Sequence, residues 1–143
     1  MIQRIQSIFL LLGSAACFGL FALPLADTDA AQSNSFLFAD QQFTIFDDPV
    51  LLGLFATAGV VLLLDVFLFK NRPLQIRLSW LSIILVLAGC GYAFFLLSSD
   101  SAQSLAGPAV GVALPIVVII FAYLARVYIQ KDEKLVRSAD RLR

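Results

Sequence analysis

Four long apolar segments divide this chain of 143 residues, and they limit what it can fold into more than any other feature. They cover residues 7–26, 49–69, 78–97 and 108–125. A helix needs about 20 consecutive apolar residues to cross the hydrocarbon core of a bilayer. The chain is 60% hydrophobic, more than the about 45–50% of soluble domains, so we expect the excess to face lipid. These segments predict an all-α fold, a four-helix transmembrane bundle in one domain.

The charged residues are sorted between the two ends of these segments. The ten Lys and Arg residues lie at the N-terminus, after the second segment and after the fourth, as Arg4, Lys70, Arg72, Arg77, Arg126, Lys131, Lys134, Arg137, Arg141 and Arg143. The other two connections, residues 27–48 and 98–107, carry only acids. Short loops rich in Lys and Arg stay in the cytoplasm. We therefore predict a multi-pass protein with both termini cytoplasmic.

The connections carry further local signals. The first segment resembles a signal peptide, but its apolar stretch is longer than a usual signal core, so we expect a retained helix. In the outer loop, residues 27–48, the aromatic runs 36–38 and 43–46 predict a short hairpin. Its Phe side chains are expected to anchor in the headgroups, or the loop serves as a lid or partner-binding segment.

Helix ends can also be read from the sequence. Asp48 followed by Pro49 predicts a capped helix start. Pro115 is expected to kink the fourth span. No Gly or Pro follows Pro115, so the fourth helix is expected to continue as a tail, residues 126–143, on the cytoplasmic side.

The residue pattern of the tail predicts a surface for a protein partner. At helical spacing, Tyr128, Leu135, Ala139 and Leu142 form an apolar stripe beside a basic one. We interpret this stripe, with Arg72 and Arg4 from the neighbouring cytoplasmic segments, as a candidate partner contact. A helix that is only solvated, or that touches headgroups, is the alternative.

Asp65 is the only formal charge inside a predicted span. A carboxylate in hydrocarbon costs several kcal/mol, so it is a functional candidate by default. Asp65 also lies near the cytoplasmic boundary, with Ser82 at a comparable depth in the next helix and Arg77 just below it. We predict an ion pair or hydrogen bond that joins the second and third helices, with an ion or proton site as the alternative.

Groups that carry catalysis or bind cofactors are scarce. The chain has no His, and Cys17 and Cys90 lie in apolar segments without a paired motif. Phosphate-binding, nucleophile-elbow and metal-ligand motifs are absent from the sequence, and the basic residues of the tail adjoin acids. We therefore expect no enzyme activity, no metal or cofactor, and no nucleic-acid partner.

Three stretches carry a resemblance that covers the whole chain in order. The start MIQRIQ, the turn FLFKNRPLQIRL and the end KDEKLVRSADRLR resemble an uncharacterised family of small four-span inner-membrane proteins of the Bacteroidota. The resemblance implies this fold and the bacterial inner membrane, and no activity. We expect membrane lipids and protein subunits as partners, and an accessory or assembly subunit of a larger membrane complex as the function. The alternative is a small oligomeric transporter or channel that uses Asp65.

Overall fold

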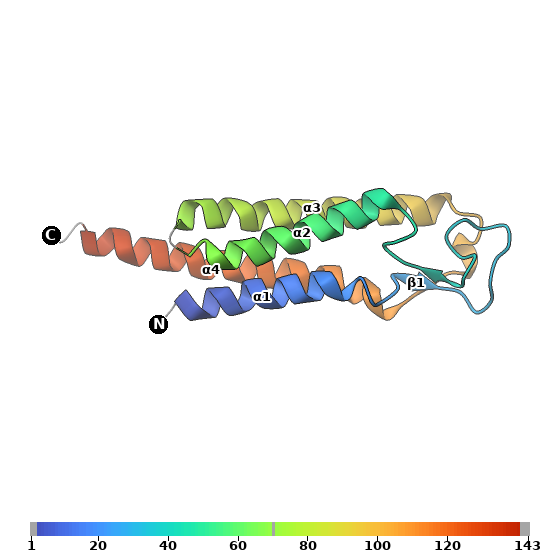
Figure 1. Cartoon of the computed structure of the whole chain (residues 1–143), viewed down its shortest axis with the longest axis horizontal. Coiled ribbons are helices and arrows are strands. Elements are labelled where there is room, and N and C mark those ends of the chain that lie inside the picture. Colours follow the sequence, from blue (N-terminus) through green and yellow to red (C-terminus); the bar gives the residue numbers. More distant parts are fainter. Residues whose placement is uncertain (1–2, 70, 141–143) are drawn as a thin grey trace.

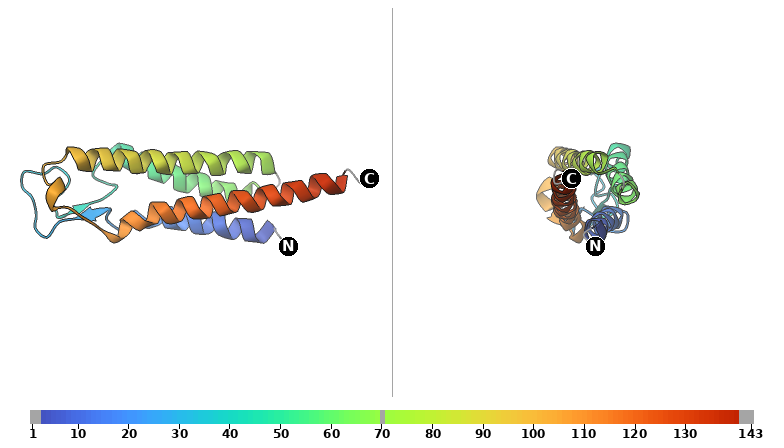
Figure 2. Two further views of the ribbon diagram at one scale, coloured as in Figure 1. Left: turned by 180° about the vertical axis from the view of Figure 1, so that it is seen from behind. Right: turned by 90° about the vertical axis from the view of Figure 1, so that its left-hand side faces the viewer.

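The computed structural model, which describes residues 3–69 and 71–140, is a bundle of four helices that run alternately up and down (Figure 1). They are α1 (Gln3–Gly19), α2 (Pro49–Phe67), α3 (Arg72–Ser99) and α4 (Ala113–Asp140). Viewed along the bundle, consecutive helices lie side by side and α4 returns beside α1 (Figure 2). The predicted all-α four-helix fold is confirmed.

One end of the bundle holds every Lys and Arg of the described residues. Here α1 begins, α2 is joined to α3, and α4 extends past the other helices (Figure 1). We call it the cationic end. A small antiparallel sheet covers the opposite end, which we call the sheet end.

Three helical segments are long and apolar enough to cross a membrane: Pro49–Phe67, Arg72–Ser99 and Val110–Val136. The first helix is shorter than the predicted span 7–26, because α1 has 17 residues and reaches about 25 Å. Single turns continue it to Ala22, whose N–H donates to Gly19 O. Pro24 then prevents further helix, since proline lacks the N–H that an α-helix requires.

The other helix boundaries follow local capping chemistry. Asp48 Oδ1 accepts from Val50 N at 2.7 Å, which confirms the predicted start of α2 at Pro49. Asn71 caps α3, so this helix begins at Arg72 rather than near 78. The predicted kink at Pro115 is wrong, because α4 begins at Ala113 and Pro115 occupies its first turn, where proline is tolerated.

The sheet end is built from three strands of two residues each, β1 (Ala26–Asp27), β2 (Gln42–Phe43) and β3 (Gly107–Pro108), in the order β2-β1-β3. The predicted hairpin between residues 36–38 and 43–46 is wrong, since Phe43 pairs with Ala26. The expected headgroup anchors Phe38 and Phe43 are buried in the core, whereas Phe36 and Phe46 are exposed. Phe38 and Phe43 are buried because strand pairing holds the loop over the end of the bundle.

Candidate functional site

A buried polar layer crosses the bundle near its cationic end. Asp65 of α2 is fully buried, and its Oδ2 accepts a hydrogen bond from Ser79 Oγ of α3 at 2.8 Å. The Gln75 side chain donates to the backbone oxygen of Asp65 at 3.0 Å. Because Gln75 and Ser79 are four residues apart, they share one face of α3. The predicted link between the second and third helices is present.

The partners differ from those the sequence indicated. Ser82 Oγ donates to Leu78 O within its own helix at 2.9 Å, and the Arg77 side chain is exposed. Among the described residues, Asp65 makes no ion pair. Ser79 and Ser82 are both buried, but Ser79 lies about one turn nearer the connection between α2 and α3, at the level of Asp65.

Gln6 of α1 belongs to the same level of the bundle. Ser14 Oγ donates to Gly59 O at 3.0 Å and Cys17 Sγ to Phe55 O at 3.1 Å, which sets the antiparallel register of α1 on α2. Two turns further along both helices, this register places Gln6 beside the turn that holds Asp65. We call Gln6, Asp65, Gln75 and Ser79 the polar layer.

The polar layer contains polar atoms that lack a hydrogen-bond partner. Within the described part of the chain, Asp65 Oδ1, Gln75 Oε1 and both polar atoms of the Gln6 carboxamide have no hydrogen-bond partner, although all four residues of the layer are fully buried. Buried polar atoms are normally paired, so such a cluster needs an explanation. Sequence reasoning missed Gln6 and Gln75. The spacing of Gln6 with Leu10, Ser14 and Cys17 could have shown that Gln6 is buried, because these four residues form the buried face of α1.

The base of the tail is fixed to the bundle by charged and aromatic contacts. Arg72 and Asp132 form an ion pair at 2.8 Å. The Arg126 guanidinium lies 4.4 Å from the centre of the Trp80 ring. Tyr128 stacks on Phe9 with ring centres 5.4 Å apart. These contacts join α4 to both α3 and α1.

These contacts change the predicted partner surface. Tyr128 stacks on Phe9 and Arg72 pairs with Asp132, so both side chains already make contacts within the bundle. Leu135 is 56% exposed, with Val136 exposed next to it. The predictions for the side chains of Arg4 and Ala139, and for Leu142, lie outside the described residues.

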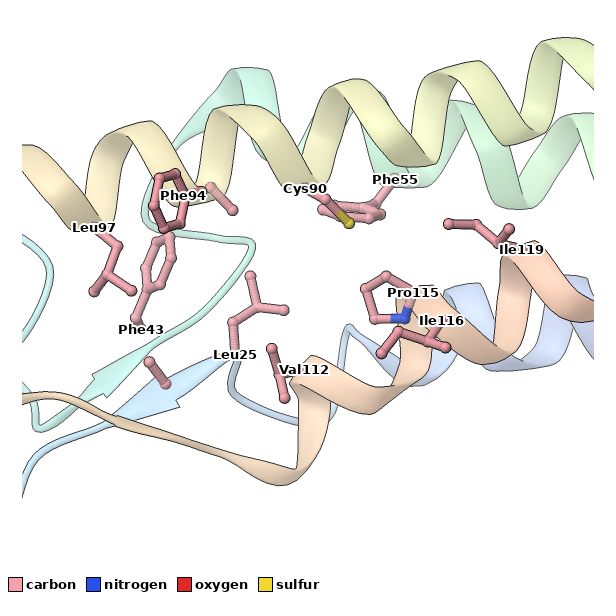
Figure 3. A pocket seen from close by; sticks show the side chains of 12 residues that line it. Leu25, Phe43, Phe55, Cys90, Phe94, Leu97, Val112, Pro115, Ile116 and Ile119 are labelled. Atoms are coloured by element: carbon pink, nitrogen blue, oxygen red, sulfur yellow. The ribbon is translucent and has the colours of Figure 1, made fainter.

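An apolar cavity of about 310 Å³ lies between α3 and α4 near the sheet end (Figure 3). It is lined by Cys90, Ala93, Phe94 and Leu97 of α3, by Pro115, Ile116 and Ile119 of α4 with Val112 just before it, and by Leu25, Ala26, Phe43 and Phe55. We call it the α3–α4 cavity. None of these lining residues carries a charge.

Within residues 3–69 and 71–140, no group of three or more His, Cys, Asp or Glu side chains could hold a metal ion. Comparison with the curated proteins found no match, and comparison with the solved structures found none either. The profile of a family described as a domain of unknown function, DUF4293, matches residues 2–142. The chain therefore belongs to the DUF4293 family.

Proposed function

We propose that this protein is a non-catalytic integral protein of the bacterial inner membrane, and that it serves as an accessory or assembly subunit of a larger membrane complex. Both termini face the cytoplasm in this proposal. The three helical segments long enough to cross a membrane support the membrane placement. The concentration of cations at one end supports the orientation, because cationic loops remain cytoplasmic.

The observation that carries the proposed role is the projecting part of α4. Figure 2 shows this helix extending beyond the ends of its neighbours at the cationic end. The Arg72–Asp132 ion pair holds its base, so the projecting turns have a defined direction. Beyond the ion pair, Leu135 and Val136 are exposed, and Lys131 and Lys134 lie beside them.

An apolar pair on a helix that stands clear of its own bundle suits a protein contact better than water. The adjoining lysines favour a partner surface with acidic groups around an apolar centre. We therefore propose that the projecting turns of α4 bind a cytoplasmic segment of a neighbouring membrane subunit.

Photo-crosslinking in living cells tests this role. A photoreactive amino acid at Leu135 should capture one integral membrane protein, whereas the same residue at Leu105, exposed at the sheet end, should not. With the probe at Leu135, Val136→Glu should abolish the capture and release the captured protein during purification in mild detergent, because Val136 is exposed next to it. Capture that is equal from both positions, or unaffected by Val136→Glu, would contradict the role.

A second function is favoured by the polar layer: a small oligomeric transporter or channel with Asp65 as an ion or proton site. A carboxylate buried without a cation costs several kcal/mol, and binding a proton or a cation removes that cost. The unpartnered Asp65 Oδ1 is the observation that supports it.

Flux into liposomes containing the purified protein separates the two functions. Asp65→Asn should abolish a proton or cation flux that Ser82→Ala leaves intact, because Ser82 bonds only within its own helix. If the wild-type protein carries no flux above that of empty liposomes, the transport function is wrong and the accessory role stands.

A further inference from the structure

We infer that the α3–α4 cavity binds one hydrocarbon chain of a membrane lipid, which enters sideways from the bilayer, and that the lipid carries an amine headgroup. This inference rests on the membrane placement proposed above. It does not depend on whether the protein is an accessory subunit or a transporter.

The size and lining of the cavity suit a hydrocarbon chain. Its volume of about 310 Å³ lies at the lower end of the roughly 300–1,000 Å³ of ligand pockets. All its lining residues are apolar, and the Cys90 thiol is the most polar of their side chains. Apolar cavities about half this size, roughly 150 Å³, stay dry and take up apolar molecules. Water is therefore a poor occupant.

The cavity exists because the two ends of α4 are held by different neighbours. Toward the cationic end, α4 is held against α3 by Arg72–Asp132 and by Arg126 on Trp80. At the sheet end, Gly111 N donates to Pro24 O at 2.9 Å and draws the start of α4 toward the first connection. The two helices diverge toward the sheet end in Figure 2.

The position of Gly111 makes this arrangement specific. A Cβ there would lie 2.2 Å from Pro24 O, so only glycine permits the approach. Opposite the displaced start of α4, the small side chain of Ala93 and the thiol of Cys90 leave space on α3. The α3–α4 cavity thus results from the Gly111–Pro24 contact on one side and from the small side chains of α3 on the other.

The mouth of the cavity opens through the side of the bundle. Phe94 of α3 is 71% exposed and Ile116 of α4 is 60% exposed, and both line the cavity (Figure 3). In the proposed placement these side chains face lipid. A chain that enters between them would reach Phe55 and Phe43, which are buried.

The charges at the sheet end select the headgroup. Ala26 lines the cavity and Asp27 follows it, exposed; Asp100 lies one turn beyond Leu97. Residues 5–69 and 78–125 contain no Lys or Arg, so no side chain at this end neutralises an anionic headgroup. Opposite charges attract and like charges repel, which favours a headgroup that carries an ammonium over one that is only anionic.

Photolabelling of the full-length protein in bilayers tests the inference. The probes are a phosphatidylethanolamine and a phosphatidylglycerol that carry the same diazirine acyl chain. The phosphatidylethanolamine probe should label peptides containing Ala93 and Ile119 severalfold more than the exposed face of α2 around Leu64, and more than the phosphatidylglycerol probe does. Ala93→Trp should fill the cavity and remove this excess, whereas Leu64→Trp should leave it.

Competition keeps the test independent of whether Ala93→Trp folds. Excess unlabelled phosphatidylethanolamine should suppress labelling of the cavity in the wild-type protein and phosphatidylglycerol should not. Asp27→Lys should reverse that preference. Labelling that is uniform over all apolar faces would overturn the cavity site while leaving the membrane placement intact. Equal labelling by both probes would overturn the headgroup assignment, and no labelling anywhere would overturn the placement itself.

Discussion

At the scale of single residues, the Asp65–Ser79 hydrogen bond is the contact on which the polar layer depends. The Ser79 hydroxyl reaches Asp65 Oδ2 at 2.8 Å, and it also lies 3.0 Å from Gln75 O of its own helix. Asp65 Oδ1 already lacks a partner among the described residues. Ser79 is thus the side chain that satisfies part of a buried carboxyl group.

Ser79→Ala should lower the free energy of unfolding by about 1–3 kcal/mol, because it leaves a second buried oxygen of Asp65 without a donor. Ser82→Ala is the matched control: Ser82 is equally buried, but its hydroxyl bonds Leu78 O one turn away. The control should cost about 0.5 kcal/mol or less. Denaturant unfolding in detergent micelles measures both, and equal losses would show that the Asp65–Ser79 bond contributes nothing particular.

At the scale of the elements, Asp100 joins the outer loop to the end of α3. Its carboxylate accepts from Ser35 Oγ at 2.7 Å and from Ala102 N at 2.8 Å, with Phe36 N and Leu37 N at 3.3 and 3.4 Å. Burial raises the pKa of Asp100, but the hydrogen bonds from Ala102, Ser35, Leu37 and Phe36 outweigh it and lower the pKa below its usual value. The outer loop is therefore held to the end of α3 by hydrogen bonds to the ionised Asp100 carboxylate.

This contact predicts a pH dependence of stability. Because the pKa is lower in the folded state, the contribution of Asp100 is complete above its unfolded value of about 3.9 and is lost as the pH falls through the lower folded value. Asp100→Asn should cost about 1 kcal/mol at pH 7 and flatten the decline in acid. Thermal unfolding from pH 7 to pH 3 measures this.

The control for Asp100 is Asp29→Asn, which changes an exposed carboxylate of the outer loop itself and should keep the wild-type profile. Curves of Asp100→Asn and wild type that run parallel below pH 4 would mean that another group accounts for the acid sensitivity.

The Arg72–Asp132 ion pair couples α3 to α4 at the base of the tail. Both side chains are mostly shielded from solvent, with 18% and 13% exposed, so the pair is expected to contribute more to the free energy of unfolding than a fully exposed pair. A double-mutant cycle with Arg72→Ala and Asp132→Ala should give a coupling of about 1 kcal/mol. Arg72→Ala combined with Lys134→Ala should be additive. A coupling no larger in the first cycle than in the second would exclude a stabilising ion pair.

At the scale of the whole molecule, the two ends differ in charge and in covering. The cationic end is where α4 projects, whereas the sheet end is closed by β1–β3 and the outer loop. The proposed orientation places the cationic end in the cytoplasm.

Labelling of single cysteines tests the orientation, with Cys17 and Cys90 replaced by alanine. A membrane-impermeant maleimide added to spheroplasts should react with Ser33→Cys, in the outer loop, and leave Ser138→Cys, near the end of α4, unlabelled until the membrane is opened. Both positions are exposed, so access alone should decide the result. The reverse pattern would contradict the orientation.

Features that depend on neighbours in the chain could be predicted from the sequence. Asp48 and Pro49 mark the start of α2 because a cap and a first-turn proline act within one turn. The continuous α4 after Pro115 follows from the absence of helix breakers. The all-α fold follows from the length of the apolar segments. The gathering of Lys and Arg at one end of the bundle follows from their positions between those segments.

The tertiary structure alone decided which residues meet across the bundle. The register of α3 on α2 selects Ser79 rather than Ser82 for Asp65, and the register of α1 brings Gln6 to the same level. The strand pairing buries Phe38 and Phe43, and the contact of Gly111 with Pro24 opens the α3–α4 cavity. Each of these depends on the rotation and register of elements distant in sequence, because an apolar segment with few polar side chains presents nearly equivalent faces to its neighbours until packing selects one.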